Sequence, residues 1–465
     1  MSEMEKKKQK GWKHWLMFCL RWGIAVAGVW YVVSHMSIRD QAWVILDHQT
    51  LIPQQVSLEY SVPESSPTFP VLHDGKIIDV PRDDVVNEPD PNVAVLVTPD
   101  GTKNVYVLGL NLTGDLNHTA KAVALLVSDQ PLKTATQAHW VTADQVPKYE
   151  VRIPHPRDQV GLKSMVHNAR PLLLWLAVLV LPITFIFTSY RWHELLKALD
   201  IHIGIGRAFV LNMVGCFYNS FMPGSTGGDL LKAYYASKQT PHRMRAVISV
   251  IVDRAVGLLA LIIIGGVMAS LQWEIPACKK VAIGSAAICV CVVFGLLVFY
   301  NPTLHRLSGL DFVLKKLPMQ KHVHSAVHAM HMYGKRPWLG LWALIVTLPV
   351  HASVITSAMF AGMAFGLPLH WAYYWVCVPV IVLAGSIPIS PQGAGVMEAF
   401  AILLTRRQGV SVSQAFALAM SIRLVQIIWN LTGGLFVLRG GFHAPTETET
   451  KELETDDEDD DEPVG

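Results

Sequence analysis

Charged residues are scarce in this chain of 465 residues, because only 16% of them are aspartate, glutamate, lysine or arginine. About 25% is usual in soluble proteins. Hydrophobic residues make up 51% of the sequence and gather in long, separate runs. This pattern excludes a water-soluble globular protein and predicts an all-α polytopic membrane protein with about six full spans.

Cysteine is absent from residues 36–166, so a disulfide framework is excluded there. The six cysteines of the chain lie mostly in or beside apolar runs, where we interpret them as small packing residues. A phosphate loop for nucleotides is also excluded, because "PGSTGGDLLK" lacks the Gly-Lys-Ser/Thr ending. No feature of the sequence indicates a nucleic-acid partner.

A metal or other cofactor is not expected either. His324, His328 and His331 share one face of a predicted helix, and such spacing can hold a metal. No carboxylate or cysteine lies nearby, and the surrounding loop is basic. We therefore interpret this segment as a solvated helix at the membrane surface.

The chain divides into four parts. Residues 1–35 begin with lysines and continue as an apolar run, which predicts an uncleaved anchor span with a cytoplasmic N-terminus. Residues 36–168 alternate apolar and polar side chains between turn residues and carry excess acid, so they predict a small extracytoplasmic β-rich insert. Residues 169–440 form the membrane domain, and the acidic residues 441–465 predict a disordered cytoplasmic tail.

Two apolar segments are short and interrupted by glycine and proline: "NSFMPGSTGGDLLK", which begins at Asn219, and "IPISPQGAGVMEAF", which ends at Phe400. In lipid, broken backbone is tolerated only where protein or a water-filled cavity surrounds it. Such a pair predicts two re-entrant helical hairpins, an inverted repeat and a binding site between them. The second hairpin is expected to enter from outside, which places Arg406 and Arg407 on the outer face, against the usual charge bias.

Ionisable residues inside apolar segments are costly and are by default functional or paired. Asp253 and Arg254 adjoin each other in "VDRAVG", and Glu398 and Arg423 lie in other apolar or interrupted segments. Adjacent side chains on a helix point about 100° apart, so each of them needs a partner elsewhere. The pairs considered are Arg254 with Glu398 and Asp253 with Arg423. Purely structural pairing is the alternative to a functional site.

The glycines of the first interruption would turn backbone N–H groups inward, and the following helix would direct its positive end to the same place. This cradle suits a lipid phosphate, whereas close helix packing is the alternative explanation of the glycines. The alternative role of Asp229 is that of a helix N-cap. The predicted headgroup-binding residues are Asn219, Pro223, Gly224, Gly227, Gly228, Asp229, Lys232, Asp253, Arg254, Pro391, Gly393, Gly395, Glu398 and Arg423. No catalytic residue is predicted.

Five motifs follow one another between Leu172 and Leu438: "RWHELLKALDI", "FYNSFMPGSTGGDLLKAYY", "VIVDRAVGLLAL", "IPISPQGAGVMEAFAILL" and "SIRL". Together they resemble the transmembrane domain of the lysylphosphatidylglycerol synthase/flippase family. The resemblance implies a bacterial or archaeal inner-membrane protein with two re-entrant hairpins, associated with moving lipids between leaflets. Lipid aminoacylation is not expected, because an acidic tail stands where the synthase members carry their soluble domain.

The predicted function is therefore that of a stand-alone flippase-like protein of the bacterial inner membrane. It would pass an anionic or zwitterionic lipid headgroup along a polar path between the hairpins. A second hypothesis is a glycosyl- or lipid-group transferase that uses external carboxylates such as Asp83 and Asp84. A third is a scaffold that binds an envelope partner through the insert. The sequence indicates no particular oligomeric state.

Overall fold

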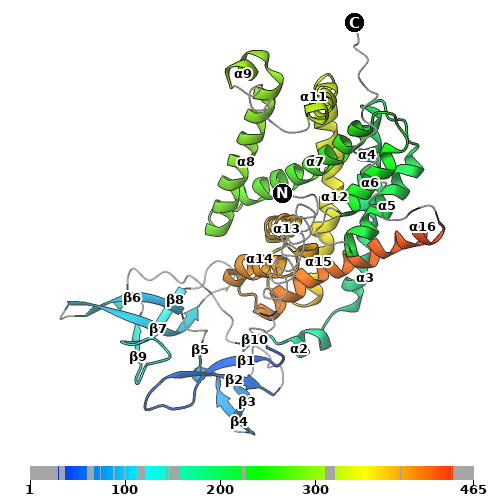
Figure 1. Cartoon of the computed structure of the whole chain (residues 1–465). Coiled ribbons are helices and arrows are strands. Elements are labelled where there is room, and N and C mark those ends of the chain that lie inside the picture. Colours follow the sequence, from blue (N-terminus) through cyan, green and yellow to red (C-terminus); the bar gives the residue numbers. More distant parts are fainter. Residues whose placement is uncertain are drawn as a thin grey trace, which may run out of the picture.

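The computed structural model of the chain contains a β-rich insert and a helical membrane domain (Figure 1). The anchor predicted over residues 1–35 and the tail predicted over residues 441–465 lie outside the described residues, except for Trp30 and Phe442. The structure describes Trp30, residues 37–59, 67–73, 75–86, 90–98, 101–113, 121–142, 145–146, 158–221, 227–308, 320–387 and 390–440, and Phe442.

The insert consists of antiparallel strands. They are β1 (Gln41–Ile45), β2 (Pro53–Leu58), β3 (Thr68–His73), β4 (Lys76–Pro81), β5 (Val85–Val86), β6 (Asp90–Thr98), β7 (Gly101–Thr113), β8 (Lys121–Ser128), β9 (His139–Thr142) and β10 (Asp158–Gln159). One sheet has the order β10-β1-β2-β3-β4, with β5 beside β1, and the other has the order β6-β7-β8-β9. Alternate residues of β1, Ala42 and Val44, are fully buried, as the two-residue period of a strand requires. The predicted β-rich insert is thus confirmed, and its extracytoplasmic location stays a prediction.

Both ends of the insert attach to the start of one membrane helix, α15 (Val412–Thr432). The hydroxyl of Ser413 donates to the carbonyl of Ser37 at 3.2 Å, and that of Ser411 donates to the carbonyl of Val160 at 3.1 Å. The two insert ends are also joined to each other, because the Gly161 amide donates to the buried Asp40 carboxylate at 2.7 Å. These hydrogen bonds therefore tie both ends of the described insert to the start of α15.

The membrane domain is helical. Its other helices are α2 (Leu162–His167), α3 (Pro171–Val180), α4 (Pro182–Lys197), α5 (Ile205–Phe221), α6 (Gly227–Ser237), α7 (Arg243–Ser270), α8 (Pro276–Tyr300), α9 (Pro302–Leu307), α11 (Gln320–Gly334), α12 (Pro337–Ala364), α13 (Trp371–Ser386), α14 (Val396–Thr405) and α16 (Gly434–Leu438). Within the described residues, five stretches are long and apolar enough to cross a membrane: α3 with α4, α7, α8, α12, and α15 with α16. This confirms a polytopic helical membrane protein.

Four of the shorter helices form two helix–break–helix pairs. Helices α5 and α6 have 17 and 11 residues, and α13 and α14 have 16 and 10, whereas a span needs about 20. The members of each pair pack against each other. These pairs are the two predicted hairpins, and their re-entrant insertion into a bilayer stays a prediction.

The two hairpins point toward each other along α7. The base of the α5–α6 hairpin adjoins the start of α7, because Ser237 is followed within a few residues by Arg243. The base of the α13–α14 hairpin lies at the other end, where the Gln272 side chain donates to the carbonyl of Ala372 at 3.0 Å. Helix α7 has 28 residues and is therefore roughly 42 Å long. The hairpin tips thus meet beside its middle, where α5 contacts the turn that precedes α14.

Each hairpin is closed by glycines that bring backbone against backbone. A Cβ atom on Gly228 would lie 1.8 Å from the carbonyl oxygen of Gly215, and one on Gly393 would lie 2.5 Å from the Cα atom of Gly385. Gly393 also has a φ of 68°, which favours glycine. The Asn219 side-chain oxygen accepts a hydrogen bond from the Gly228 amide at 2.7 Å. Close packing therefore accounts for Gly228 and Gly393.

Cysteines placed at the two hairpin bases should react from opposite sides of the membrane. Gln239 follows α6 and Pro368 precedes α13, and both positions are exposed. In intact cells expressing a variant without native cysteines, an impermeant maleimide should label Pro368→Cys. It should label Gln239→Cys only after permeabilisation, as read from a mass-tag gel shift. Labelling of both positions from one side would contradict the opposed arrangement.

Gly228→Ala should destabilise the α5–α6 hairpin, because its methyl group would overlap the Gly215 carbonyl. Overpacking typically costs about 1–3 kcal/mol and more where backbone must move, so the unfolding temperature in detergent should fall. Gly206→Ala is the matched control, since a Cβ atom there meets nothing within 4 Å. An equal fall for both variants would show that the close approach is unimportant.

Candidate functional site

Asp253 lies near the middle of α7 and is buried between two cations. Its Oδ1 atom accepts from Arg191 Nε at 2.8 Å, and its Oδ2 atom accepts from Lys232 Nζ at 3.3 Å. The three side chains are only 4–8% exposed. Since both carboxylate oxygens contact a cation, the group carries one excess positive charge inside the membrane domain.

The two cations are held in place by further contacts. Arg191 also donates from Nη1 to the hydroxyl of Thr347 at 2.6 Å. Lys232 donates to Asn212 Oδ1 at 3.2 Å, and its ammonium lies 4.1 Å from the centre of the Trp192 ring. These contacts join α4, α5, α6, α7 and α12 around one carboxylate.

Arg254 contacts both hairpin tips. Its Nη1 atom donates to the Asp229 carboxylate in the first turn of α6, and its Nη2 atom donates to the carbonyl of Ser386 at 3.2 Å, at the end of α13. The side chains of Arg254 and Asp229 are 27% and 30% exposed. This ion pair is therefore only partly buried, unlike the group around Asp253.

Glu398 and Arg423 form a third charged group, at the start of α14. Arg423 Nη2 lies 2.8 Å from Glu398 Oε1 and 3.1 Å from Oε2. The Oε2 atom also accepts from the Gly395 amide at 2.8 Å, which caps the helix N-terminus. Glu398 is fully buried, and Arg423 has a side chain 11% exposed. Two donors thus compensate this buried carboxylate.

The structure corrects the two pairs considered from the sequence. Arg254 is paired with Asp229 rather than Glu398, and Asp253 is paired with Arg191 and Lys232 rather than Arg423. The wrong pairs arose because sequence spacing does not determine which helices cross beside α7.

The remaining predicted site residues lie at the hairpin tips or outside the described part of the chain. Asn219 closes the first tip, as described above, and Gly227 begins α6. Pro391 belongs to η3 (Pro391–Gly393), the short 3-10 turn before α14, and Gly395 has a φ of 81° at the helix start. Pro223 and Gly224 lie outside the described residues.

Four cations and three carboxylates gather around the hairpin tips. The cations are Arg191, Lys232, Arg254 and Arg423, and the carboxylates are Asp229, Asp253 and Glu398. The group therefore has an excess of one positive charge. In a low-dielectric region such an excess attracts an anionic group, and helices α6 and α14 begin there with their positive ends.

Two other candidate sites were considered from the sequence: the carboxylates Asp83 and Asp84, and the histidines of α11. Neither belongs to the charged group at the hairpin tips. Asp83 and Asp84 lie in the 3-10 turn η1 (Arg82–Asp84) of the insert, where Asp84 Oδ2 lies 3.6 Å from His48 Nε2. Burial and the nearby Arg245 cation lower the pKa of His328. Among the described residues, no three His, Cys, Asp or Glu side chains gather in a way that could hold a metal.

A buried charged group beside the middle of α7, between two opposed helix–break–helix pairs, is a polar site within a polytopic helical membrane protein. The chain belongs to the family of the lysylphosphatidylglycerol synthase transmembrane region, whose sequence pattern matches residues 157–434. It is also 23% identical, over 292 residues, to a UPF0104 membrane protein of Methanothermobacter thermautotrophicus. That alignment covers 58% of this chain and 86% of the relative. The family expected from the motifs is confirmed.

Asp253→Asn should strongly destabilise the membrane domain, because it leaves two buried cations without a carboxylate. Removing one partner of a buried ion pair costs about 3–5 kcal/mol. We expect a large loss of monodisperse protein and a lower unfolding temperature, measured by tryptophan fluorescence in detergent.

Asp229→Asn is the control for this substitution, because its partner Arg254 is partly exposed. A partly exposed pair contributes less than a fully buried one, so this variant should lose much less stability than Asp253→Asn. If Asp253→Asn is as stable as Asp229→Asn, the buried group does not hold the helices together.

Proposed function

We propose that this protein moves a lipid headgroup between leaflets through the polar region at the hairpin tips. The observation that carries the proposal is the position of Arg254, which contacts both tips and remains partly exposed. A headgroup that bears a phosphate could replace the Asp229 carboxylate as the partner of the Arg254 guanidinium. Phosphate and carboxylate both accept paired hydrogen bonds from this planar group. The acyl chains would stay in the surrounding bilayer.

The broken backbone supports the same role. Inside a membrane, irregular backbone is found where it is buried in protein or lines a cavity, and transporters place substrate sites between such broken helices. Here Gly395 and the first turn of α6 present helix N-termini beside Arg254 and Arg423. The excess positive charge favours an anionic headgroup, and a zwitterionic one with a phosphate is a weaker ligand of the same kind.

Two separate hydrophobic cores define two groups of helices that can move relative to each other. One core includes Ala246 near the start of α7 together with residues of α4, α5, α6 and α11. The other includes Ile264 near its end together with residues of α12, α13, α14 and α15. Arg254 lies on α7 between these two regions. Rocking of one core against the other about Arg254 would open the polar region at the hairpin tips first to one side of the membrane and then to the other, as alternating access requires.

The orientation of the chain in the membrane is part of the proposal. Arg207, Lys238, Arg243 and Arg245 lie at the base of the first hairpin, and basic residues favour the cytoplasmic side. The insert then lies outside, the termini lie in the cytoplasm, and the membrane is the bacterial plasma membrane. The acidic tail is proposed to be dispensable for lipid movement.

The proposal is tested by lipid scrambling in reconstituted vesicles. Fluorescent phospholipids, one anionic and one zwitterionic, are added to both leaflets, and dithionite quenches those in the outer one. Wild-type protein should make the inner pool accessible, faster for the anionic lipid. Arg254→Ala should slow this exchange at least about tenfold, equivalent to roughly 1.4 kcal/mol in the barrier. Arg254→Lys keeps the charge but loses the fork geometry, so its rate should fall between the two.

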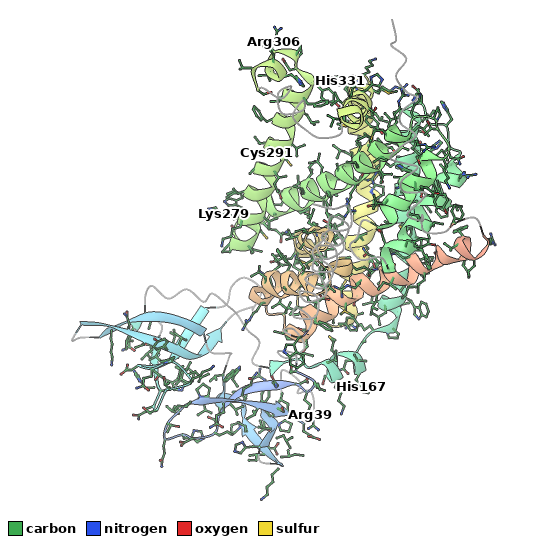
Figure 2. All side chains as sticks on the ribbon, viewed as in Figure 1. Arg39, His167, Lys279, Cys291, Arg306 and His331 are labelled. Atoms are coloured by element: carbon green, nitrogen blue, oxygen red, sulfur yellow. The ribbon has the colours of Figure 1, made fainter. Side chains whose placement is uncertain are left out.

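Arg306→Ala is the control, since Arg306 is exposed on α9, far from the hairpin tips (Figure 2). Rates are divided by the amount of monodisperse protein, which separates activity from folding. Unchanged scrambling in Arg254→Ala would overturn the proposed headgroup path. Absence of scrambling in wild-type vesicles with either lipid would overturn the proposed function itself.

A further inference from the structure

A groove of about 350 Å³ lies between α7 and α8, near the turn that joins them. Its walls are apolar or small side chains, among them Ile262, Val267, Ile283 and Ala286. The volume falls within the range of about 300–1,000 Å³ that is usual for ligand pockets. The groove is separate from the charged group at the hairpin tips, because none of its lining residues belongs to that group.

Small residues create the groove. The two helices touch at Gly266 and Ser285, since a Cβ atom on Gly266 would lie 2.6 Å from the Ser285 Cβ. Ala282 and Ala286 lie beside this contact and leave space on the α8 side. Along α7 the lining extends from Ile262 to Ser270, which is roughly 12 Å at 1.5 Å per residue. The space is therefore long, narrow and apolar.

Cations lie at the mouth of the groove. Lys279 is at the lower end of α8 in Figure 2, and its ammonium lies 5.4 Å from the centre of the Trp273 ring, which lines the mouth. Lys280 is exposed beside it, and Glu274 is an exposed acid in the same turn. Neither lysine forms an ion pair with another described residue. The mouth thus has an aromatic ring and a net positive charge.

We propose that this groove binds a phospholipid with an anionic headgroup, as a resident ligand and independently of any lipid movement. One acyl chain would fill the apolar groove, and the phosphate would lie at Lys279 and Lys280. Both lysines follow the end of the apolar window of α7, where tryptophan and lysine are typical of the membrane–water interface. An ammonium group attracts a phosphate on either side of the membrane, so charge and shape favour the same ligand.

The lipid would also support α8. Only 6% of the apolar window of this helix is buried, compared with 33% for α7. An acyl chain between the two helices would extend their contact beyond the crossing at Gly266. Loss of the lipid should therefore loosen α8 without disturbing the hairpin tips.

The test is the retention of defined lipids by the whole protein. Purified protein is incubated in detergent with equal amounts of phosphatidic acid and phosphatidylcholine of matched chains, then examined as the intact complex by native mass spectrometry. Wild-type protein should retain phosphatidic acid in preference to phosphatidylcholine. Ala286→Trp should fill the groove and reduce the retained phosphatidic acid about tenfold, equivalent to roughly 1.4 kcal/mol. Val290→Trp, on the same helix but 68% exposed and outside the lining, is the control.

A second pair of variants tests the headgroup contact. Lys279→Gln with Lys280→Gln should remove the preference for phosphatidic acid, whereas Lys335→Gln, which follows α11 and is outside the groove lining, should preserve it. If Ala286→Trp elutes as aggregate, the smaller Ala286→Leu takes its place. Equal retention in the Ala286 and Val290 variants would overturn the groove as the site. Equal retention of both lipids by wild-type protein would overturn the anionic assignment, whatever the scrambling measurements give.

Discussion

A single carboxylate at the depth of Asp253 would be costly, and a single cation would be equally so. The membrane domain meets this constraint by bringing Arg191 from α4 and Lys232 from α6 to opposite oxygens of one side chain on α7. Each of the three charges needs the others, so the helices that carry them cannot separate without leaving a charge alone in an apolar region. The crossing of these helices, and with it the position of the first hairpin, follows from that requirement.

The residue next to Asp253 has a different environment because neighbouring side chains on a helix point about 100° apart. Arg254 leaves the buried group and reaches the space between the hairpin tips, where its partner Asp229 and the Ser386 carbonyl come from opposite sides of the domain. The two residues of this dipeptide thus have different surroundings: Asp253 is buried between two cations, and Arg254 is partly exposed. The buried contact of Asp253 and the partly exposed contact of Arg254 come from adjacent residues of α7.

Much of the architecture could be predicted from the sequence, because long apolar runs and Gly/Pro interruptions are local features. The β-rich insert and the positions of the hairpin breaks were correctly predicted for that reason. The partners of Asp253 were not, because they depend on helix crossings. Arg191 was missed since it stands at the end of an apolar run, where a basic residue is typical of a membrane border. An arginine followed directly by tryptophan in that run is the signal that was available.

The attachment of the insert has a structural consequence. Its two ends meet at Ser411 and Ser413, in the N-cap and first turn of α15, and the same helix carries Arg423 to the second hairpin tip. Residues 413 and 423 lie on this one helix, roughly 15 Å apart at 1.5 Å per residue. The insert and the second hairpin tip are thus attached to the same helix, α15. The ends of the insert are therefore connected through one helix to the Glu398–Arg423 pair, although no insert residue contacts that pair in the described hydrogen bonds.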